Sequence, residues 1–180
     1  MALYPVIADL FDRHGDEMYG EDVTQRQHAL QCAHWARQEE APDRLVLAAL
    51  LHDIGHMVSD LPEDAAHHGN DDLHEDLGDV WLRQYYDADI TDPIRLHVAA
   101  KRYLTAVDEE YLEKLSAASQ LSLKLQGGPM SPEEIEEFRK EPHFEWAVRL
   151  RRWDDRGKDT DFTPPGLESY EDLINREIRA

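Results

Sequence analysis

Apolar residues along this chain recur mostly at three- and four-residue spacing, the period of helices packed against a core. No clear run of two-residue alternation between hairpin turns occurs, so strands are not expected. The pattern predicts an all-α fold with helices over 21–38, 44–53, 73–85, 108–125 and 142–156. A further helix is expected to begin at Asp92-Pro93. Another is expected to begin at Ser131, because the Pro and Glu residues that follow it are typical of a helix start.

One predicted helix stands apart because it has no polar face. Residues Leu45 to Leu51 are all apolar, so the helix over 44–53 is predicted to be central, with Asp43 as its N-cap and Gly55 at its end. His52 and Asp53 close this apolar run. An unpartnered buried carboxylate is costly, and a metal ion is one of the few partners that can hold a carboxylate and an imidazole together. We therefore favour a metal-ligand role for this pair.

Turn-forming segments divide the rest of the chain. A polar stretch over 61–72 is expected to be a surface loop, and Gln126-Gly127-Gly128-Pro129 ends the helix over 108–125. After Pro164-Pro165-Gly166, a short amphipathic segment either covers the core or frays.

At 180 residues the chain fits one domain. We expect a single domain over 1–180, with its core at about 15–160 and a C-terminal tail at about 159–180.

Composition narrows the possible partners. The chain carries 39 Asp and Glu against 19 Lys and Arg, a net charge of -20, which argues against nucleic acid and membrane surfaces as partners. No segment approaches membrane-spanning length, no secretory signal is evident, and Cys32 is the only cysteine. We expect a cytoplasmic protein that binds a small molecule through a local basic cluster, and the sequence leaves its oligomeric state open.

Other potential ligands lie on separate predicted helices or near their ends. Taken singly, each is more often an ordinary core or surface residue. Side chains from separate helices converge in a bundle core, so residues far apart in sequence are compatible with one metal site. The candidates beside His52 and Asp53 are His28, His74, His97 and Asp154. We assign no metal to the remaining histidines, which are His14, His34, His56, His67, His68 and His143.

The pattern of His28, His52-Asp53 and Asp154 resembles the HD-domain superfamily, which is named after its His-Asp pair. The resemblance implies an HD-domain helical bundle in which these residues bind metal, and most members are phosphohydrolases. The addition of His74 and His97 resembles the subset that holds two metal ions, with the Asp of the pair bridging them.

Three stretches sharpen the resemblance, which covers about residues 15–160. The first is Tyr19-Gly20-Glu21 followed by Gln25 and His28 to His34, the second runs from Leu115-Ser116 to Gly128, and the third is Arg151 to Asp155. Together they resemble the mixed-valent diiron HD-domain oxygenases that cleave the carbon–phosphorus bond of 2-amino-1-hydroxyethylphosphonate and close analogues. This combination is far more specific than an HD pair alone.

The resemblance implies two iron ions, Fe²⁺ and Fe³⁺, with O₂ as co-substrate and Asp53 as the bridge. One iron would be held by His28, His52, Asp53 and Asp154, and the other by Asp53, His74 and His97. Asp53, His56 and Lys101 would serve catalysis. The amine of the substrate would be recognised by Glu21, and its phosphonate by His56, Lys101, Ser119, Ser122 and Arg151.

One position departs from the family. Its best-known form has an iron-binding tyrosine three residues before the glutamate that matches Glu21, and here that residue is Met18. Tyr19 is adjacent, but on a helix it is expected to point elsewhere. Met18, Tyr19 and nearby acidic residues are therefore candidates for holding a bulkier cationic head, such as a trimethylammonium group.

The spacing of the other residues suits this chemistry. His97 and Lys101 are four residues apart and share a helical face, so a metal ligand and an ammonium would point into one cavity. Lys101 and Arg151 supply the positive charge that a phosphonate needs in an acidic chain. In the absence of the resemblance, surface ion pairing is an equally good explanation for Lys101.

The leading hypothesis is an O₂-dependent enzyme that releases phosphate from a 1-hydroxy-2-aminoethylphosphonate or its trimethylammonio analogue, giving glycine or glycine betaine. The alternative is a metal-dependent HD phosphohydrolase acting on a nucleotide or another phosphate ester. A third hypothesis, an acidic binding module with a structural metal, is less consistent with several solvent-directed groups in one predicted cavity. Imidazole and carboxylate ligands alone suit iron, manganese or zinc, so iron is implied only by the resemblance.

Overall fold

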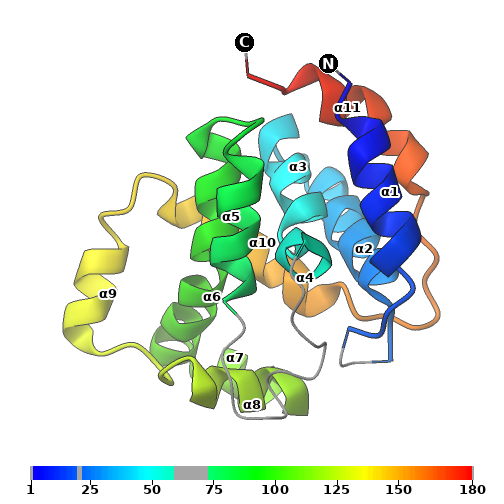
Figure 1. Ribbon diagram of the computed structural model, residues 1–180. Helices are drawn as coiled ribbons and strands as arrows, with labels where there is room; N and C mark the ends of the chain where they lie inside the picture. Colours follow the sequence, from blue (N-terminus) through cyan, green and yellow to red (C-terminus); the bar gives the residue numbers. More distant parts are fainter. Residues whose placement is uncertain (1, 20–21, 59–72, 180) are drawn as a thin grey trace.

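The computed structural model describes residues 2–19, 22–58 and 73–179. In these residues every regular element is helical, apart from one isolated bridge between Met18 and Thr24, so the all-α prediction is confirmed (Figure 1). The helices are α1 (Tyr4–His14), α2 (Gln25–Gln38), α3 (Asp43–Leu51), α4 (Ile54–Val58), α5 (His74–Leu82), α6 (Ala88–Val107), α7 (Glu109–Lys114), α8 (Ala117–Leu125), α9 (Pro132–Phe138), α10 (Phe144–Arg156), η2 (Leu167–Tyr170) and α11 (Glu171–Arg176). The expected loop over 61–72 lies outside the described residues.

Helix α3 is the centre of the molecule, as its sequence predicts. All residues from Leu45 to Leu51 are buried, because α2, α6 and α10 pack around this helix (Figure 1). Burial of apolar surface on all sides of one helix is the main force that fixes its position. The residues that follow α3 are therefore held at the meeting point of the surrounding helices.

The predicted ends of α3 were wrong in two details. Asp43 is the first helical residue, and Pro42 is the N-cap. Gly55 does not end the helix, which stops at Leu51; after a turn at His52-Asp53, Gly55 lies inside α4. Its role is close packing, because a Cβ atom at Gly55 would lie 1.9 Å from the backbone oxygen of His74.

Three other helix boundaries differ from the sequence pattern. Helix α2 begins at Gln25 rather than at 21, because Thr24 and Gln27 form a capping box. Helix α6 begins at Ala88, so Pro93 lies inside it instead of at its first turn. The predicted helix over 108–125 is two helices, because the side chain of Ser116 caps a new one. The helix start predicted at Ser131, by contrast, is confirmed, because Ser131 is the N-cap of α9 and forms a capping box with Glu134.

The two ends of the described chain pack together. Helix α1, which the pattern did not predict, has no side-chain cap of its own; Asn175 Oδ1 accepts hydrogen bonds from the backbone nitrogens of Leu3 and Tyr4, at 2.8 and 3.1 Å. Four tail side chains are buried in the main core, namely Leu167, Tyr170, Leu173 and Ile174. The tail therefore covers the core rather than fraying, and α11 lies beside α1 (Figure 1).

A second, smaller apolar cluster lies between the C-terminal half of α6 and helices α7 to α10. It includes Leu96, Tyr103, Leu123 and Phe138. Leu123 belongs to α8, so this cluster fixes α8 beside α6 at the lower edge of the molecule in Figure 1. The serines of α8 are thereby presented toward the central helices.

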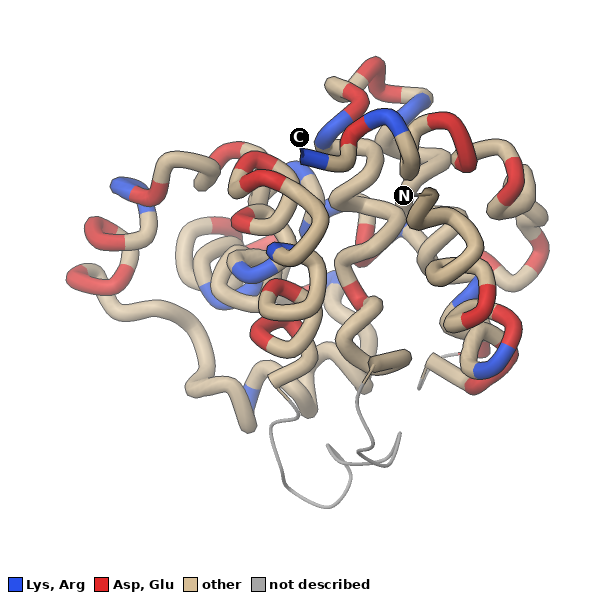
Figure 2. The backbone as a smooth tube through the Cα atoms, turned by 45° about the horizontal axis from the view of Figure 1, so that its top comes forward, with Lys and Arg blue, Asp and Glu red and all other residues tan. Residues whose placement is uncertain are grey.

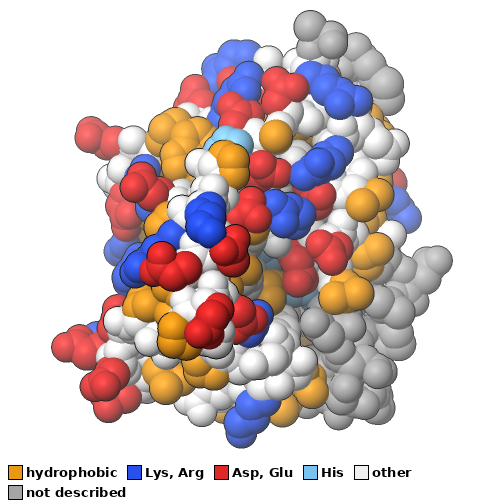
Figure 3. Space-filling view, turned by 90° about the vertical axis from the view of Figure 1, so that its left-hand side faces the viewer, with side chains coloured by type: hydrophobic (Ala, Val, Ile, Leu, Met, Phe, Trp, Pro, Cys, Tyr) orange, Lys and Arg blue, Asp and Glu red, His pale blue; other side chains and the backbone are white. Residues whose placement is uncertain are grey.

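Charged side chains are spread over the outer helices, with acidic residues in excess (Figure 2). On the face that carries α9, basic and acidic side chains are interspersed with apolar ones (Figure 3). In the described part of the chain, no helix combines the length and apolar character needed to cross a membrane.

Candidate metal centre

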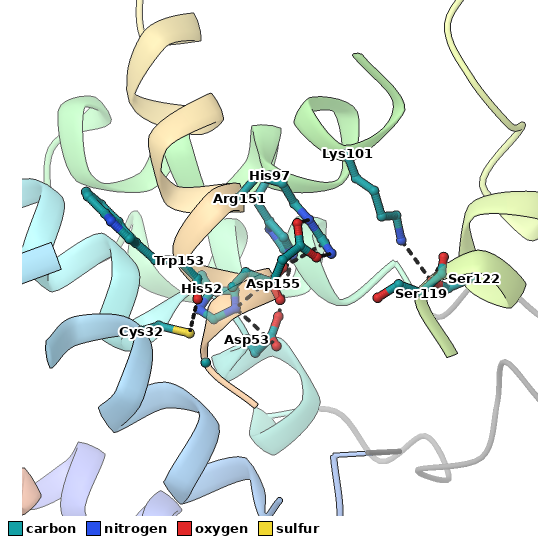
Figure 4. Close-up of polar contacts among 12 residues, drawn as sticks. Cys32, His52, Asp53, His97, Lys101, Ser119, Ser122, Arg151, Trp153 and Asp155 are labelled. Carbon is teal, nitrogen blue, oxygen red and sulfur yellow. Dashed lines mark hydrogen bonds and ion pairs between the residues drawn. The ribbon is translucent and has the colours of Figure 1, made fainter. Parts of the chain in front are cut away.

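The six predicted metal ligands come together in the structure. His28 comes from α2, and His52-Asp53 forms the turn after α3. His74 begins α5, His97 lies in α6 and Asp154 lies near the end of α10. All six residues are buried, with exposures of 9% or less, and Figure 4 shows three of them, His52, Asp53 and His97.

The carboxylate of Asp53 lies between two pairs of histidines. Its Oδ2 atom is 3.3 Å from Nε2 of His28 and 3.2 Å from Nε2 of His52. Its Oδ1 atom is 3.4 Å from Nε2 of His74 and 3.5 Å from Nε2 of His97. Neither oxygen makes a hydrogen bond within the described residues. Each oxygen therefore has its own pair of imidazoles, which is the arrangement expected of a bridging carboxylate.

Hydrogen bonds to backbone oxygens indicate which ring nitrogen carries the proton in His28, His52 and His97. Nδ1 lies 2.9 Å from the Gly157 oxygen in His28, 3.0 Å from the Ala49 oxygen in His52, and 2.6 Å from the Ile94 oxygen in His97. A backbone carbonyl only accepts, so each Nδ1 carries the proton and the neutral ring keeps a lone pair on Nε2.

The Nε2 atoms of the four histidines face each other in pairs. Nε2 of His28 is 3.2 Å from Nε2 of His52, and the same distance separates Nε2 of His74 from Nε2 of His97. In the pair of His28 and His52, two lone pairs at this distance repel each other unless a cation lies between them, and carbonyl-bound Nδ1 atoms are the usual support of metal-binding histidines. The residues present therefore fit two metal ions.

The electrostatics of the cluster also favour a bound cation. Burial alone would raise the pKa of Asp53, but His52 and the other histidines hold it well below the usual range. Burial holds the pKa of His97 well below its ordinary value, so this imidazole is neutral. Burial opposes a charge on His52 as well, yet Asp53 raises its pKa, because two buried carboxylates attract positive charge into the cluster. A bound metal ion would supply that charge.

Asp154 lies on the Oδ2 side of Asp53. Its Oδ1 atom is 3.5 Å from Nε2 of His28, and its Oδ2 atom is 2.7 Å from Nη1 of Arg151. Arg151 also pairs with Asp155 and donates from Nε to the Tyr111 hydroxyl at 3.1 Å. The guanidinium is therefore held between two carboxylates rather than standing alone.

Tyr19 corrects a sequence-based expectation. It does not lie on a helix but in the extended segment before α2, where successive side chains point to opposite sides: Met18 is half-exposed and Tyr19 points inward. The Tyr19 ring stacks on His28 with centroids 3.8 Å apart, and its hydroxyl donates to Asp154 Oδ1 at 3.3 Å. Lys158 Nζ lies 5.5 Å from the ring centroid. The ring therefore contacts the metal cluster, and it is not an open face for a cationic head.

The predicted phosphonate-binding residues lie around this cluster. The His56 ring stacks on His74 with centroids 4.2 Å apart. Lys101 is buried and donates to Ser122 Oγ at 2.8 Å (Figure 4). Burial, assisted by the charge of Arg151, lowers the pKa of Lys101 to about 7. Ser119 is also buried, and Glu21 lies outside the described residues.

Sequence reasoning missed one cation. Lys158 follows α10 directly and donates from Nζ to Ser119 Oγ at 3.1 Å. It lies between the last predicted helix (142–156) and the predicted tail, and it gave no signal because an isolated lysine is normally exposed. Three of the histidines left unassigned by the sequence make contacts elsewhere: His14 with Glu17, His34 with Trp35 and His143 with Asp92. His67 and His68 lie outside the described residues.

Residues 17–136 match the HD domain family. The chain belongs to the HD-domain family. Over 173 residues it is 43% identical to the [1-hydroxy-2-(trimethylamino)ethyl]phosphonate dioxygenase (glycine-betaine-forming) of Leisingera caerulea, a match that covers 96% of this chain and 88% of that protein. Over 163 residues it is 45% identical to the hydroxymethylphosphonate dioxygenase of Gimesia maris, covering 90% and 81%. The resemblance to HD-domain phosphonate oxygenases is thus confirmed.

The HD-domain chain is also similar to an uncharacterized protein, L432, of Acanthamoeba polyphaga mimivirus. The two are 35% identical over 172 residues, which cover 93% of this chain and 78% of the viral protein. The similarity to all three proteins extends over most of the chain, so it includes α10 with Asp154, beyond the residues matched by the HD domain itself.

Proposed function

We propose that this HD-domain protein is an O₂-dependent oxygenase that cleaves the carbon–phosphorus bond of a 1-hydroxyphosphonate. The observation that carries the proposal is the position of Asp53, whose two oxygens each face the Nε2 atoms of a pair of histidines. The same chain is 43% and 45% identical to two phosphonate dioxygenases. The hydrolase alternative is not favoured, because both of these characterised relatives are named as oxygenases.

The substrates named for the two relatives share one chemical group. Each has a hydroxyl on the carbon that bears phosphorus, but one carries a trimethylamino group and the other carries only hydrogen. The shared group therefore defines the reacting end of the substrate. In the sequence-based prediction, the hydroxyl-bearing carbon also carries an aminomethyl or trimethylammoniomethyl group. Glu21 is the residue predicted to bind the positive charge of that group.

Two iron ions fit the donor set, as Fe²⁺ and Fe³⁺. The first would be held by His28, His52, Asp53 and Asp154, and the second by Asp53, His74 and His97. When bound, such a pair supplies the redox chemistry that dioxygen requires. The protein supplies fixed ligand orientation through the carbonyl oxygens of Gly157, Ala49 and Ile94.

The remaining residues bind and orient the substrate. In this proposal Lys101 and the serines of α8 receive the phosphonate, and His56 lies beside the His74 side of the cluster. Arg151 acts largely by holding Asp154 in place, since its guanidinium is already paired with two carboxylates. We assign the catalytic roles to Asp53, His56 and Lys101, as in the sequence-based prediction.

The overall reaction balances without a further reductant. One dioxygen is consumed for each phosphonate: the carbon–phosphorus bond breaks, the hydroxyl-bearing carbon becomes a carboxylate carbon, and phosphorus leaves as phosphate. Dioxygen accepts all the electrons that the substrate gives up. With an aminomethyl or trimethylammoniomethyl substituent the organic product is glycine or glycine betaine.

Two further sequence-based predictions belong to this proposal, namely a single domain over 1–180 and a cytoplasmic location.

The test is phosphate release by iron-loaded protein from two kinds of substrate. We expect release from hydroxymethylphosphonate, 2-amino-1-hydroxyethylphosphonate or its trimethylammonio analogue, and none from nucleotides or other phosphate monoesters. Asp53→Ala should abolish release while the helical circular dichroism spectrum is retained. Release from phosphate esters and not from any phosphonate would support the hydrolase instead.

A further inference from the structure

All three nitrogens of the Arg151 guanidinium have partners. Nη1 lies 2.7 Å from Asp154 Oδ2, and Nη2 pairs with Asp155 (Figure 4). Nε lies 3.1 Å from both the Tyr111 hydroxyl and Asp155 Oδ2, and that hydroxyl donates to Asp155. Arg151 is buried, where an unpaired polar group is costly. The partners therefore hold the guanidinium in one orientation.

Tyr111 is the partner that comes from another helix. Asp154 and Asp155 follow Arg151 on α10, whereas Tyr111 lies on α7, to which no predicted metal ligand belongs. The backbone nitrogen of Tyr111 donates at 3.1 Å to the side chain of Asp108, the N-cap of α7. Its ring is buried in the smaller apolar cluster. The cap fixes the backbone and the cluster fixes the ring, so the hydroxyl has a defined position.

Asp154 lies at the other end of this series of contacts. Its Oδ1 atom accepts from the Tyr19 hydroxyl at 3.3 Å and lies 3.5 Å from Nε2 of His28. Its Oδ2 atom is paired with Arg151 and lies 4.0 Å from Nε2 of His52. Rotation of the carboxylate would break its contact with Arg151 or with Tyr19. Carboxylates that bind metal are commonly oriented by such outer partners, whose loss weakens metal binding.

We propose that Tyr111 is a positioning residue for the first metal ion of the proposed pair, because it fixes Arg151, which in turn fixes the carboxylate of Asp154. Asp155 pairs with both Tyr111 and Arg151, so the charge of the arginine is shared between two carboxylates. Tyr111 acts through Arg151 and not by contact with the metal ion or the substrate. This inference rests on the proposed function, since it concerns a ligand of the same centre.

The experiment compares Tyr111→Phe with Tyr103→Phe, a matched control. Both tyrosines are 9% exposed and belong to the same apolar cluster, and each hydroxyl accepts a hydrogen bond from an arginine. For Tyr103 that arginine is Arg139, which pairs with the exposed Glu136 instead of a predicted metal ligand. Both substitutions therefore remove one hydroxyl and keep the buried ring.

Binding of Fe²⁺ to metal-free protein is measured in the absence of oxygen by competition with a chelator. We expect Tyr111→Phe to weaken the binding of one of two Fe²⁺ ions about tenfold to hundredfold, the usual effect of losing an outer partner of a ligand. Tyr103→Phe should bind both ions as wild type does. In a His97→Ala background, where only the first ion is expected, Tyr111→Phe should weaken the remaining ion by the same factor.

Asp155→Asn tests the route through Arg151. It should weaken the same ion, and the double variant with Tyr111→Phe should lose less than the product of the two factors, because both substitutions act on one guanidinium. Unchanged Fe²⁺ affinity in Tyr111→Phe, equal weakening of both ions, an equal effect of Tyr103→Phe, or independent effects of Tyr111→Phe and Asp155→Asn would overturn the proposal. Because binding is measured without substrate, a wild-type protein that released no phosphate from any hydroxyphosphonate would refute the proposed function alone.

Discussion

Asp53 separates two pairs of histidines with a single carboxylate, and in the proposed site it bridges two metal ions. Its Oδ2 atom faces His28 and His52, whereas its Oδ1 atom faces His74 and His97. Loss of one histidine should therefore affect one metal ion, and loss of Asp53 should affect both. An active site with a single metal ion would not show this difference.

Metal content measures that difference. His97→Ala is expected to reduce bound iron from two ions to one per chain, whereas Asp53→Ala should lose nearly all of it. His34→Ala is the control, because His34 lies on the same helix as His28 but contacts Trp35 and Phe162. Equal iron losses in His97→Ala and Asp53→Ala would contradict a bridging carboxylate.

Lys101 is expected to serve function at the expense of stability. Its pKa falls from 10.5 to about 7 chiefly through burial, so between these pH values the unfolded chain binds more protons than the folded one. The contribution of Lys101 to the free energy of unfolding therefore becomes more favourable as pH rises from 7 to 10.5. Each unit of such a shift corresponds to about 1.4 kcal/mol.

Replacing the buried ammonium should make the protein more stable and inactive. We predict that Lys101→Met raises the free energy of unfolding at pH 7 by roughly 1–4 kcal/mol, the range seen when buried charges are replaced by apolar groups. This advantage should shrink as pH approaches 10. Denaturant titrations of metal-free protein at several pH values measure it, and a variant that is less stable than wild type at every pH would count against this account.

At the level of elements, local sequence signals predicted some boundaries and not others. The capping box at Ser131 was recognisable because both partners lie within four residues of each other. Ser116 was missed because the apolar spacing continues across it, although its side chain starts a new helix. Pro93 misled the prediction, since packing of Ile90 and Ile94 in the core extends α6 before it.

The contact between α4 and α5 gives an element-scale prediction. Gly55→Ala would place its Cβ atom against the His74 oxygen, so α5 must move. We expect a loss of about 1–3 kcal/mol in the free energy of unfolding, typical of overpacking, and weaker binding of the metal ion at His74.

Gly78→Ala is the matched control on the facing helix. The nearest atom to a Cβ at Gly78 is 3.4 Å away, and alanine favours helix by about 1 kcal/mol over glycine. This variant should be as stable as wild type or slightly more stable, with normal metal content. Calorimetric unfolding and metal analysis of both variants test the contrast, which would be refuted if Gly55→Ala behaved like Gly78→Ala.

At the scale of the whole molecule, the ends of the described chain form a supporting layer on the far side of the core from α8 (Figure 1). The six metal-ligand candidates were predictable because family resemblance fixes them in sequence. Tyr19 and Lys158 were not, because their positions depend on tertiary contacts with His28, Asp154 and Ser119. Helix α1 was not among the predicted helices, although it has Pro in its first turn and buried Ile7, Leu10 and Phe11 at helical spacing. The part that the sequence could not show is its cap, because Asn175 lies more than 170 residues away.

Asn175 offers a test of this supporting layer. Asn175→Ala should lower the free energy of unfolding by about 1 kcal/mol, the usual effect of removing a helix cap. Metal content should not change, because the layer is remote from the cluster. Arg176→Ala is the neighbouring control: its ion pairs are exposed and should contribute little. Equal effects of the two substitutions on thermal unfolding would contradict a capping role for Asn175.

The central claim is that the cluster around Asp53 uses dioxygen to break a carbon–phosphorus bond. The most direct measurement is phosphate release by iron-loaded protein from a hydroxyphosphonate, with oxygen uptake recorded in the same vessel. The account predicts one dioxygen consumed per phosphate, no release under anaerobic conditions, and recovery when air is admitted. Phosphate release that continues without oxygen would contradict it.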